Sequence, residues 1–171
     1  KGKALAPFHG GQQITVVLAG HSANQQRQPC ILCSSPKDLS TYRIIVRHRA
    51  SPDPTHTHDP VASHLVGLET GEHIFCNAPH GTYRTIEKEN DRLPVLISQG
   101  LGIAPMLSLL YELEEQRDQL FLFHQPSADE PQRLKNEVRT LLARNPDWHM
   151  IQAAPDAPDW LNAELVHLHA P

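Results

Sequence analysis

The sequence contains few aromatic residues, few cysteines and no long apolar run. Aromatic residues make up 5% of the 171 positions, and hydrophobic residues make up 39%. No stretch comes near the roughly 20 consecutive apolar residues of a transmembrane helix, so we expect no membrane span. The three cysteines are an odd number at irregular spacing. This argues against a secreted disulfide framework and predicts a reducing compartment, the cytoplasm.

An excess of positive charge is missing as well. The formal net charge is -4 and the isoelectric point is about 6.3, so the chain has no basic field with which to hold a phosphodiester backbone. Nucleic acid is therefore not an expected partner. Proline, by contrast, is abundant: the 15 prolines are about 9% of the chain, against a usual level of about 5%. This excess favours strands and loops over a helical bundle.

Short β-prone runs, separated by turn residues, fill the chain to about Ile86, and no amphipathic helix of useful length fits there. The expected strands span residues 13–19, 29–33, 41–48, 73–77 and 83–86. Several short strands at this spacing predict a small antiparallel barrel or sandwich in this part of the chain. The charged stretch at residues 87–92 is interpreted as a linker to a second domain.

From residue 93 onwards, strands alternate with helices. Residues 94–98 form the continuous apolar run that is typical of a buried parallel strand. Apolar residues recur at helical spacing from Pro105 onwards, and a strand at 120–123, a helix at 134–142 and a strand at 148–151 follow. This β-α-β-α-β order predicts a parallel, Rossmann-like nucleotide-binding α/β domain over residues 93–171. The pattern fades after Pro155.

The turn between the first of these strands and its helix carries two glycines, Gly100 and Gly102, followed by Pro105. The glycines allow positive φ and let the backbone approach a ligand without a Cβ in the way. Pro105 at the helix start gives up an amide that has no partner within the helix. The remaining amides and the positive helix end can hold a pyrophosphate. The alternative is a tight strand-to-helix turn without a ligand.

The block LISQGLGIAPM at residues 96–106 resembles the nicotinamide-nucleotide motif ISxGxGxTPM of the ferredoxin-NADP reductase superfamily. That family includes the reductase modules of flavohaemoglobins and of oxygenase reductases. Ala104 stands in place of the motif's threonine, and Gln99 in place of a small residue. Five other segments follow the family's order: residues 7–12 are similar to PFxxGQ, 42–47 to YRIxVK, 61–65 to GxxSxxL, 71–72 to GD and 78–83 to APxGxF. Their order and spacing carry the resemblance over roughly residues 7–150.

The resemblance implies that residues 1–88 form an antiparallel Greek-key β-barrel that binds FAD. It also implies hydride transfer from NADH or NADPH to FAD, and then single-electron delivery to a haem or iron-sulfur partner such as a [2Fe-2S] domain. The protein's part in such chemistry is placement of the cofactors, so no side chain needs to act as an acid or a base. Ser98 would contact the nicotinamide side, and the turn would hold the pyrophosphate. His124 stands where the family carries a histidine, and a purely structural strand-end histidine is the alternative. The implied nucleotide-site residues are Ser98, Gly100, Gly102, Ile103, Ala104, Pro105 and His124.

The implied flavin-site residues are Arg27, Cys30, Arg47, Val61, Ala62 and Ser63. In the family, the tyrosine of an RxYS or RxYT motif stacks on the flavin. Aligned from Arg27, the chain has Pro29 at the tyrosine and Cys30 at the hydroxyl position; aligned from residues 34–36, it has Gln28 at the arginine and Cys30 at the tyrosine. Either way the ring is missing, which lowers flavin affinity by about 1 to 3 kcal/mol. Pro60 also replaces a glycine of the pyrophosphate turn. We therefore expect a weakened flavin site.

The family's carboxyl-terminal CGP strand has no counterpart before residue 171, and the chain begins at Lys1 without methionine. We therefore expect the second domain to be incomplete, and a fragment, a decayed gene and a short protein are all open.

Two other functions are open. One is a catalytically silent member of the family that keeps the scaffold as a binding module. The other is a metal-dependent hydrolase, in which His56, His58, Asp59 and His64 hold a divalent ion. The CxxC motif at residues 30–33 lies in a β-like run and is interpreted as a buried structural pair, and Cys76 is expected in the core.

Overall fold

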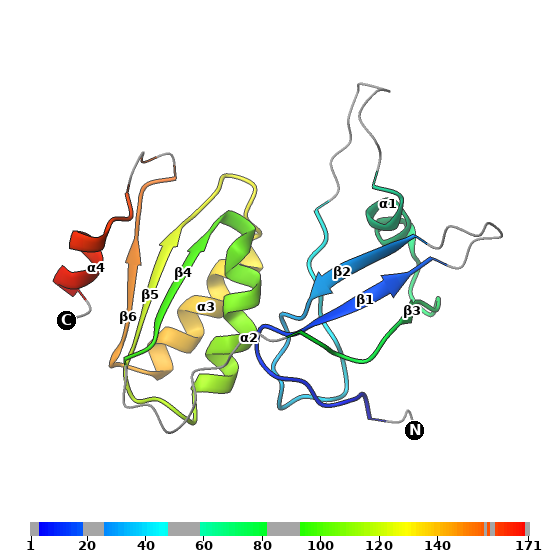
Figure 1. Cartoon of the computed structure of the whole chain (residues 1–171), viewed down its shortest axis with the longest axis horizontal. Coiled ribbons are helices and arrows are strands. Elements are labelled where there is room, and N and C mark those ends of the chain that lie inside the picture. Colours follow the sequence, from blue (N-terminus) through cyan, green and yellow to red (C-terminus); the bar gives the residue numbers. More distant parts are fainter. Residues whose placement is uncertain are drawn as a thin grey trace.

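The computed structural model describes residues 4–18, 26–47, 59–81, 93–155, 157 and 160–169. These residues form two halves, each built on its own sheet (Figure 1). The first sheet is antiparallel, with strand order β2-β1-β3, and the second is parallel, with order β4-β5-β6. An antiparallel sheet followed by a parallel α/β sheet is the fold class that the sequence predicts, and it is confirmed.

The antiparallel sheet consists of β1 (Gln13–Val17), β2 (Arg27–Ile31) and β3 (Phe75–Cys76). Side chains alternate along β1, so that Ile14 and Val16 point into a small core. The other buried members of this core are Phe8, Cys30, Leu32 and Val61.

Two of the predicted strands are much shorter than expected. In the segment at residues 41–48, Ile44 forms an isolated bridge with Leu32, and in the segment at 73–77 only β3 pairs with β1. The side chains of residues 73–77 are all exposed, so this segment has no buried face to hold a longer pairing. Cys76 is therefore exposed, and the prediction that it lies in the core is wrong. The predicted strand at 83–86 and the linker at 87–92 lie outside the described residues.

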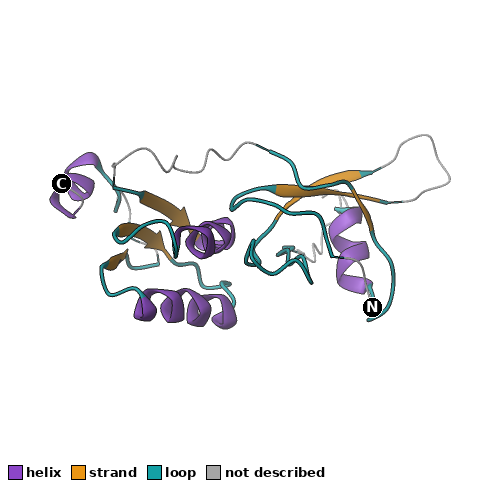
Figure 2. Cartoon of the chain, turned by 90° about the horizontal axis from the view of Figure 1, so that it is seen from below, coloured by secondary structure: helices purple, strands orange, loops and turns teal. Residues whose placement is uncertain are grey.

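A helix that the sequence did not predict, α1 (Pro60–Gly67), lies beneath the antiparallel sheet (Figure 2). It is only eight residues long and buries Val61 and Ala62, which leaves too little periodicity to detect. Asp59 begins the helix as its N-cap, and Pro60 takes the first position, where a missing amide costs nothing.

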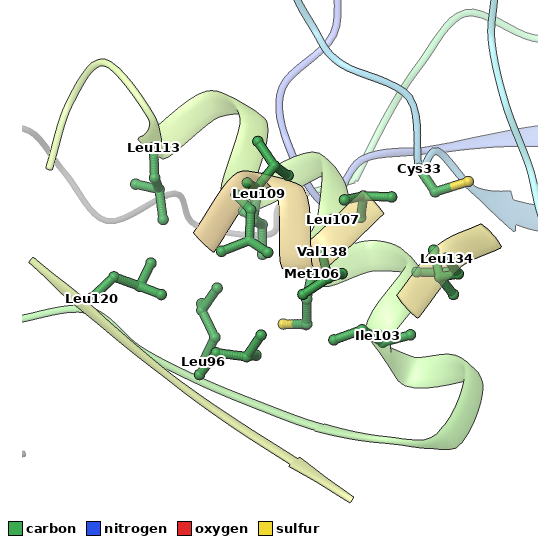
Figure 3. Close-up of a cluster of buried hydrophobic side chains, with 14 of the residues drawn as sticks. Cys33, Leu96, Ile103, Met106, Leu107, Leu109, Leu113, Leu120, Leu134 and Val138 are labelled. Atoms are coloured by element: carbon green, nitrogen blue, oxygen red, sulfur yellow. The ribbon is translucent and has the colours of Figure 1, made fainter. Parts of the chain in front are cut away.

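The parallel sheet consists of β4 (Val95–Gln99), β5 (Leu120–Gln125) and β6 (Trp148–Gln152). The helices α2 (Ile103–Leu113) and α3 (Gln132–Arg144) connect these strands, and α2 begins before the expected Pro105. Both helices share a core with the sheet, in which Leu96 and Leu120 from the strands meet Leu107 from α2 and Val138 from α3 (Figure 3). Cys33, which comes from the first half, also belongs to this core.

A further helix, α4 (Ala163–His169), follows β6 in the region where the sequence pattern fades. The ring of His169 meets the ring of Phe123 with their centroids 6.4 Å apart. The longest helix among the described residues is α3, with 13 residues, and no described helix combines the length and apolar character needed to cross a bilayer.

The two halves meet where the Gly10–Gly11 turn lies against α2. The Gly10 amide donates to Glu112 Oε2 at 2.5 Å, and the Gly11 amide donates to Ser108 Oγ at 2.9 Å. A Cβ on Gly10 would lie 2.8 Å from Leu109 Cα, which is backbone and cannot turn aside. Glycine is therefore required at position 10 for this approach.

A second contact between the halves is an ion pair between Arg43 and Glu137 of α3. The Arg43 Nη1 and Nη2 atoms each donate to Glu137 at 2.8 Å, and Nη2 also donates to the Cys33 carbonyl at 2.6 Å. The Tyr111 hydroxyl donates to the same carboxylate. We call Arg43, Glu137 and Tyr111 the seam network, because they join the first half to α2 and α3.

The titration behaviour of the seam network follows from these bonds. The hydrogen bond to Glu137 raises the pKa of Arg43. Partial burial, followed by the hydrogen bond to Glu137, raises the pKa of Tyr111 to about 12. Partial burial acts to raise the pKa of Glu137, but the hydrogen bonds from Arg43 and Tyr111 outweigh it and leave this pKa below its usual range.

We expect Glu137→Gln to lower the free energy of unfolding by about 1 to 2 kcal/mol, because the charged acceptor of both Arg43 and Tyr111 is lost. The difference in the free energy of unfolding between this variant and the unsubstituted chain should also depend on pH. Since the pKa of Glu137 is lowered by folding, its contribution is present above the pKa of an unfolded glutamate, about 4.3, and is lost as the pH falls through the lower folded value. Urea unfolding at pH 7 and below pH 4 measures both effects.

Glu115→Gln is a matched control. Glu115 also bridges the halves, through a 2.8 Å ion pair with Lys37, but 75% of its side chain is exposed. Such exposed pairs contribute about 0 to 1 kcal/mol. An equal loss of stability for the two variants would contradict the importance of the seam network.

Candidate functional site

The glycine turn joins β4 to α2 as a short 3-10 helix, Gly100–Gly102. Gly100 has a φ of 50°, and a Cβ there would lie 2.9 Å from Ser127 Oγ. Position 100 therefore needs glycine for reasons internal to the fold. Gly102 has a helical φ of -61°, so of the two glycines only Gly100 uses the positive φ that glycine allows.

The space over Gly102 is open. A Cβ at this position would find only the Ser98 Cβ within 4 Å, at 4.0 Å. The absence of a side chain at Gly102 is therefore not needed by the fold, and it leaves room for a ligand beside Ser98. The Ile103 amide already donates to the carbonyls of Gly100 and Leu101, so it is engaged within the turn.

The remaining turn residues serve the fold of the second half. The side chains of Ile103 and Ala104 are 1% and 6% exposed and belong to the core of the second half. Pro105 lies within the first turn of α2, where its missing amide needs no partner.

A row of polar side chains crosses the carboxyl end of the parallel sheet on the side covered by α2 and α3. The strand register places Ser98 next to His124 and His124 next to Gln152. The preceding row on the same face is apolar, with Leu96 next to Leu122. The sheet thus changes from an apolar to a polar surface beside the glycine turn.

Two hydrogen bonds connect the buried members of this region. Ser98 Oγ lies 2.9 Å from His124 Nδ1, and His124 Nε2 lies 3.0 Å from Glu130 Oε2. The three residues are 6%, 2% and 6% exposed, respectively. The structure therefore brings together two residues that the sequence analysis named separately. Glu130 was missed because it lies in the loop after β5, where no periodicity indicates which way a side chain points.

A pocket lies next to His124 and Glu130, between the end of the sheet and α3. Its polar wall includes Lys135 and Arg139, one helical turn apart on α3. The other lining residues are Ile103, Pro126, Val138, Met150 and Gln152.

The start of α1, where the resemblance implies a flavin phosphate site, is already occupied by a side chain. Asp59 Oδ1 accepts from the amides of Val61 and Ala62, both at 3.0 Å. The Ser63 amide donates to the Asp59 carbonyl, also at 3.0 Å. All three amides in the implied phosphate segment are thus satisfied by Asp59. A flavin diphosphate could reach them only if this carboxylate turned away.

The other implied flavin residues, Arg27, Cys30 and Arg47, differ in their surroundings. Arg27 is exposed on β2, whereas Cys30 is buried in the core of the first half. Burial, followed by the charge of Asp59, raises the pKa of Cys30, which keeps the thiol protonated. Arg47 forms a 3.0 Å ion pair with Asp129, in the loop between β5 and α3. Ser127, which lies over Gly100, donates to the same Asp129 at 2.6 Å.

The histidine-based metal site receives no support from the described residues. His56 and His58 lie outside them, and Asp59 is engaged as the helix cap. Within the described ranges, no group of three or more histidine, cysteine or acidic side chains is placed to hold a metal ion.

Several known proteins resemble this chain in sequence or in fold. No family model matches the chain. The chain is 34% identical over 115 residues to a flavohemoprotein of Halalkalibacterium halodurans, a match that covers 66% of this chain and 27% of that protein. It thus spans about a quarter of the relative's length.

Two solved structures are similar in fold. The flavohem-like FAD/NAD binding domain of nitric oxide dioxygenase from Vibrio cholerae superimposes with a TM-score of 0.71 at 22% identity, covering 91% of this chain and 65% of that one. Ferredoxin-NADP+ reductase from Plasmodium falciparum with 2'P-AMP superimposes with a TM-score of 0.69 at 12% identity, covering 94% and 67%. The chain is thus similar in sequence to a flavohemoprotein and in fold to a flavohem-like FAD/NAD binding domain and a ferredoxin-NADP+ reductase, which agrees with the resemblance that its motifs carry.

Proposed function

We propose that this chain supplies the FAD-binding and NAD(P)H-binding parts of an oxidoreductase, in which hydride passes from NADH or NADPH to FAD and electrons continue to a haem or iron-sulfur partner. Residues 1–88 would bind the flavin and residues 93–171 the nucleotide. The observation that carries the proposal is the open space over Gly102 beside Ser98, at the start of α2. The similarity to a flavohemoprotein supports it.

The nucleotide would be held mainly by the backbone. At the start of α2, a pyrophosphate would meet the positive helix end, with the Ile103 amide already engaged within the turn. The lack of a Cβ at Gly102 lets the pyrophosphate come close, and the nearby Ser98 hydroxyl can meet the nicotinamide. His124 would act behind Ser98, through their hydrogen bond.

The flavin site fits its ligand less well. FAD, when bound, would convert a hydride into single electrons. The Asp59 carboxylate, however, occupies the amides of Val61 and Ala62, and its negative charge repels a diphosphate. This observation favours a second candidate function, a catalytically silent module that binds the pyridine nucleotide and no flavin.

The purified chain separates these two functions. The oxidoreductase is expected to bind added FAD, to give a yellow protein and to reduce ferricyanide in an NADH- or NADPH-dependent manner. The silent module would stay colourless while calorimetry still recorded binding of a pyridine nucleotide. No heat with NADH or NADPH would refute both.

Gly102→Ala is expected to weaken nucleotide binding about tenfold or more, because the added Cβ fills the space meant for the pyrophosphate. Its effect on stability should be slightly favourable, by about 0.5 kcal/mol, since alanine is a better helix former than glycine at a helical φ. Calorimetric titration with NADPH and NADH, together with urea unfolding, measures the two effects.

Gly100→Ala should have the opposite effect on stability. A left-handed backbone costs alanine about 1 to 2 kcal/mol, and the new Cβ would lie 2.9 Å from Ser127 Oγ. We expect this variant to lose stability. If Gly102→Ala bound both nucleotides as well as the unsubstituted chain, the turn would not be the pyrophosphate site.

Asp59→Gly is expected to raise FAD affinity about fivefold, because it frees two amides and removes a negative charge from the helix start. Glycine is a tolerable N-cap, so the stability of α1 should fall by only a few tenths of a kcal/mol. Asp38→Gly is the matched control, since Asp38 also caps a turn, through the amide of Ser40. An unchanged affinity in Asp59→Gly, measured by flavin fluorescence titration, would mean that FAD does not use α1.

The unpaired state of the cysteines supports a reducing compartment such as the cytoplasm for this activity.

A further inference from the structure

Ser98, His124 and Glu130 form a hydrogen-bonded chain that the proposed function does not by itself require. Each side chain is more than nine-tenths buried, and the two bonds, at 2.9 and 3.0 Å, join the ends of β4 and β5 to the loop before α3. Buried polar groups lose free energy unless they are paired. We call this set the Ser-His-Glu chain. Its direction is the direction in which the proton of each hydrogen bond points, from Ser98 towards Glu130 or the reverse.

The Glu130 end sets the direction. Lys135 and Arg139 line the same pocket as Glu130 and His124, so a carboxylate at Glu130 has positive charge nearby in addition to its bond with His124 Nε2. An ionised carboxylate can only accept a hydrogen bond, so His124 Nε2 carries the proton of this bond. When this is the only proton on the ring, Nδ1 has a lone pair.

The Ser98 end follows from this. A lone pair on Nδ1 accepts the Ser98 hydroxyl proton, which is thereby turned away from the glycine turn. The oxygen of Ser98 keeps its own lone pairs for any group that lies over Gly102, the open position beside it.

We propose that Glu130 and His124 are positioning residues that make Ser98 a hydrogen-bond acceptor at the nucleotide site, where it receives an N–H of the nicotinamide carboxamide. The identity of that donor rests on the proposed function, whereas the direction of the chain does not. The consequence is selectivity for a ring substituent that carries an N–H group over one of similar shape that carries none.

The direction is tested first, without a ligand. In the ¹⁵N-labelled full chain at pH 7.5, two-bond ¹H–¹⁵N correlation spectra are expected to show His124 as a neutral imidazole protonated at Nε2, with the signal assigned by its loss in His124→Asn. In Glu130→Gln the protonation pattern should change, because the amide can also donate. A proton on Nδ1 of the unsubstituted chain would overturn the proposal, whatever the chain binds.

The acceptor role is tested by calorimetry with NAD+ and with its 3-acetylpyridine analogue, in which a methyl ketone replaces the carboxamide and removes both N–H donors. One net hydrogen bond corresponds to a preference for NAD+ of about fivefold in the unsubstituted chain. Ser98→Ala should bind the two ligands with equal affinity. Glu130→Gln should reduce the preference for NAD+ over the analogue. Glu115→Gln, at an exposed ion pair with Lys37, should retain the full preference for NAD+.

The possible failures are distinguishable. Equal binding of the two ligands by the unsubstituted chain overturns the acceptor role and leaves the proposed function intact. Binding of neither overturns both the proposed function and this role of Ser98, while the imidazole spectrum still decides the direction of the chain. If Glu130→Gln does not fold, Ser98→Ala, which removes only a hydroxyl, keeps the comparison decisive.

Discussion

The close approach of the Gly10–Gly11 turn to α2 is the constraint on which the arrangement of the two halves depends. At Gly10 there is no room for even one additional carbon atom, and the backbone amides of this turn are satisfied by Glu112 and Ser108 of the helix. Arg43 and Glu137 then fix the rotation of the halves about this contact. The same helix α2 begins directly after the Gly100–Gly102 turn. The contact between the halves and the candidate nucleotide site therefore share one rigid element.

The starts of α1 and α2 show two uses of the same physics. Both carry the partial positive charge of a helix start. At α1 the chain's own Asp59 accepts from the amides of Val61 and Ala62. At α2 no side chain caps the helix, and the space over Gly102 is open. The contrast favours a nucleotide at the start of α2 over a flavin at the start of α1.

Much of the second half could be predicted because its elements have strong periodicity. The continuous apolar run of β4 and the spaced leucines of α2 and α3 specify their structure locally. The first half was harder. Its strands are held by a few buried residues, such as Ile14 and Val16, and α1 is too short to show a pattern. Pairings such as Leu32 with Ile44 depend on contacts between distant segments, which a local pattern does not contain.

The candidate site divides in the same way. Gly100, Gly102 and Ser98 lie within one local motif, so the sequence placed them together. The contribution of Glu130 depends on how a loop folds back over the sheet, and the blocking role of Asp59 depends on a helix that was not foreseen. Arg47 was expected in the flavin site, yet it forms an ion pair with Asp129 in the second half. Long charged side chains reach partners that only the tertiary structure decides.

The location of Cys33 has a practical consequence. Its thiol is fully buried in a core built mainly from the other half, whereas Cys30 lies in the core of its own half and Cys76 is exposed. Separation of the halves would uncover Cys33 while leaving Cys30 covered. The chain therefore carries a natural chemical reporter, in which the alkylation rate of one sulfur, calibrated against the surface thiol, counts how often the interface opens.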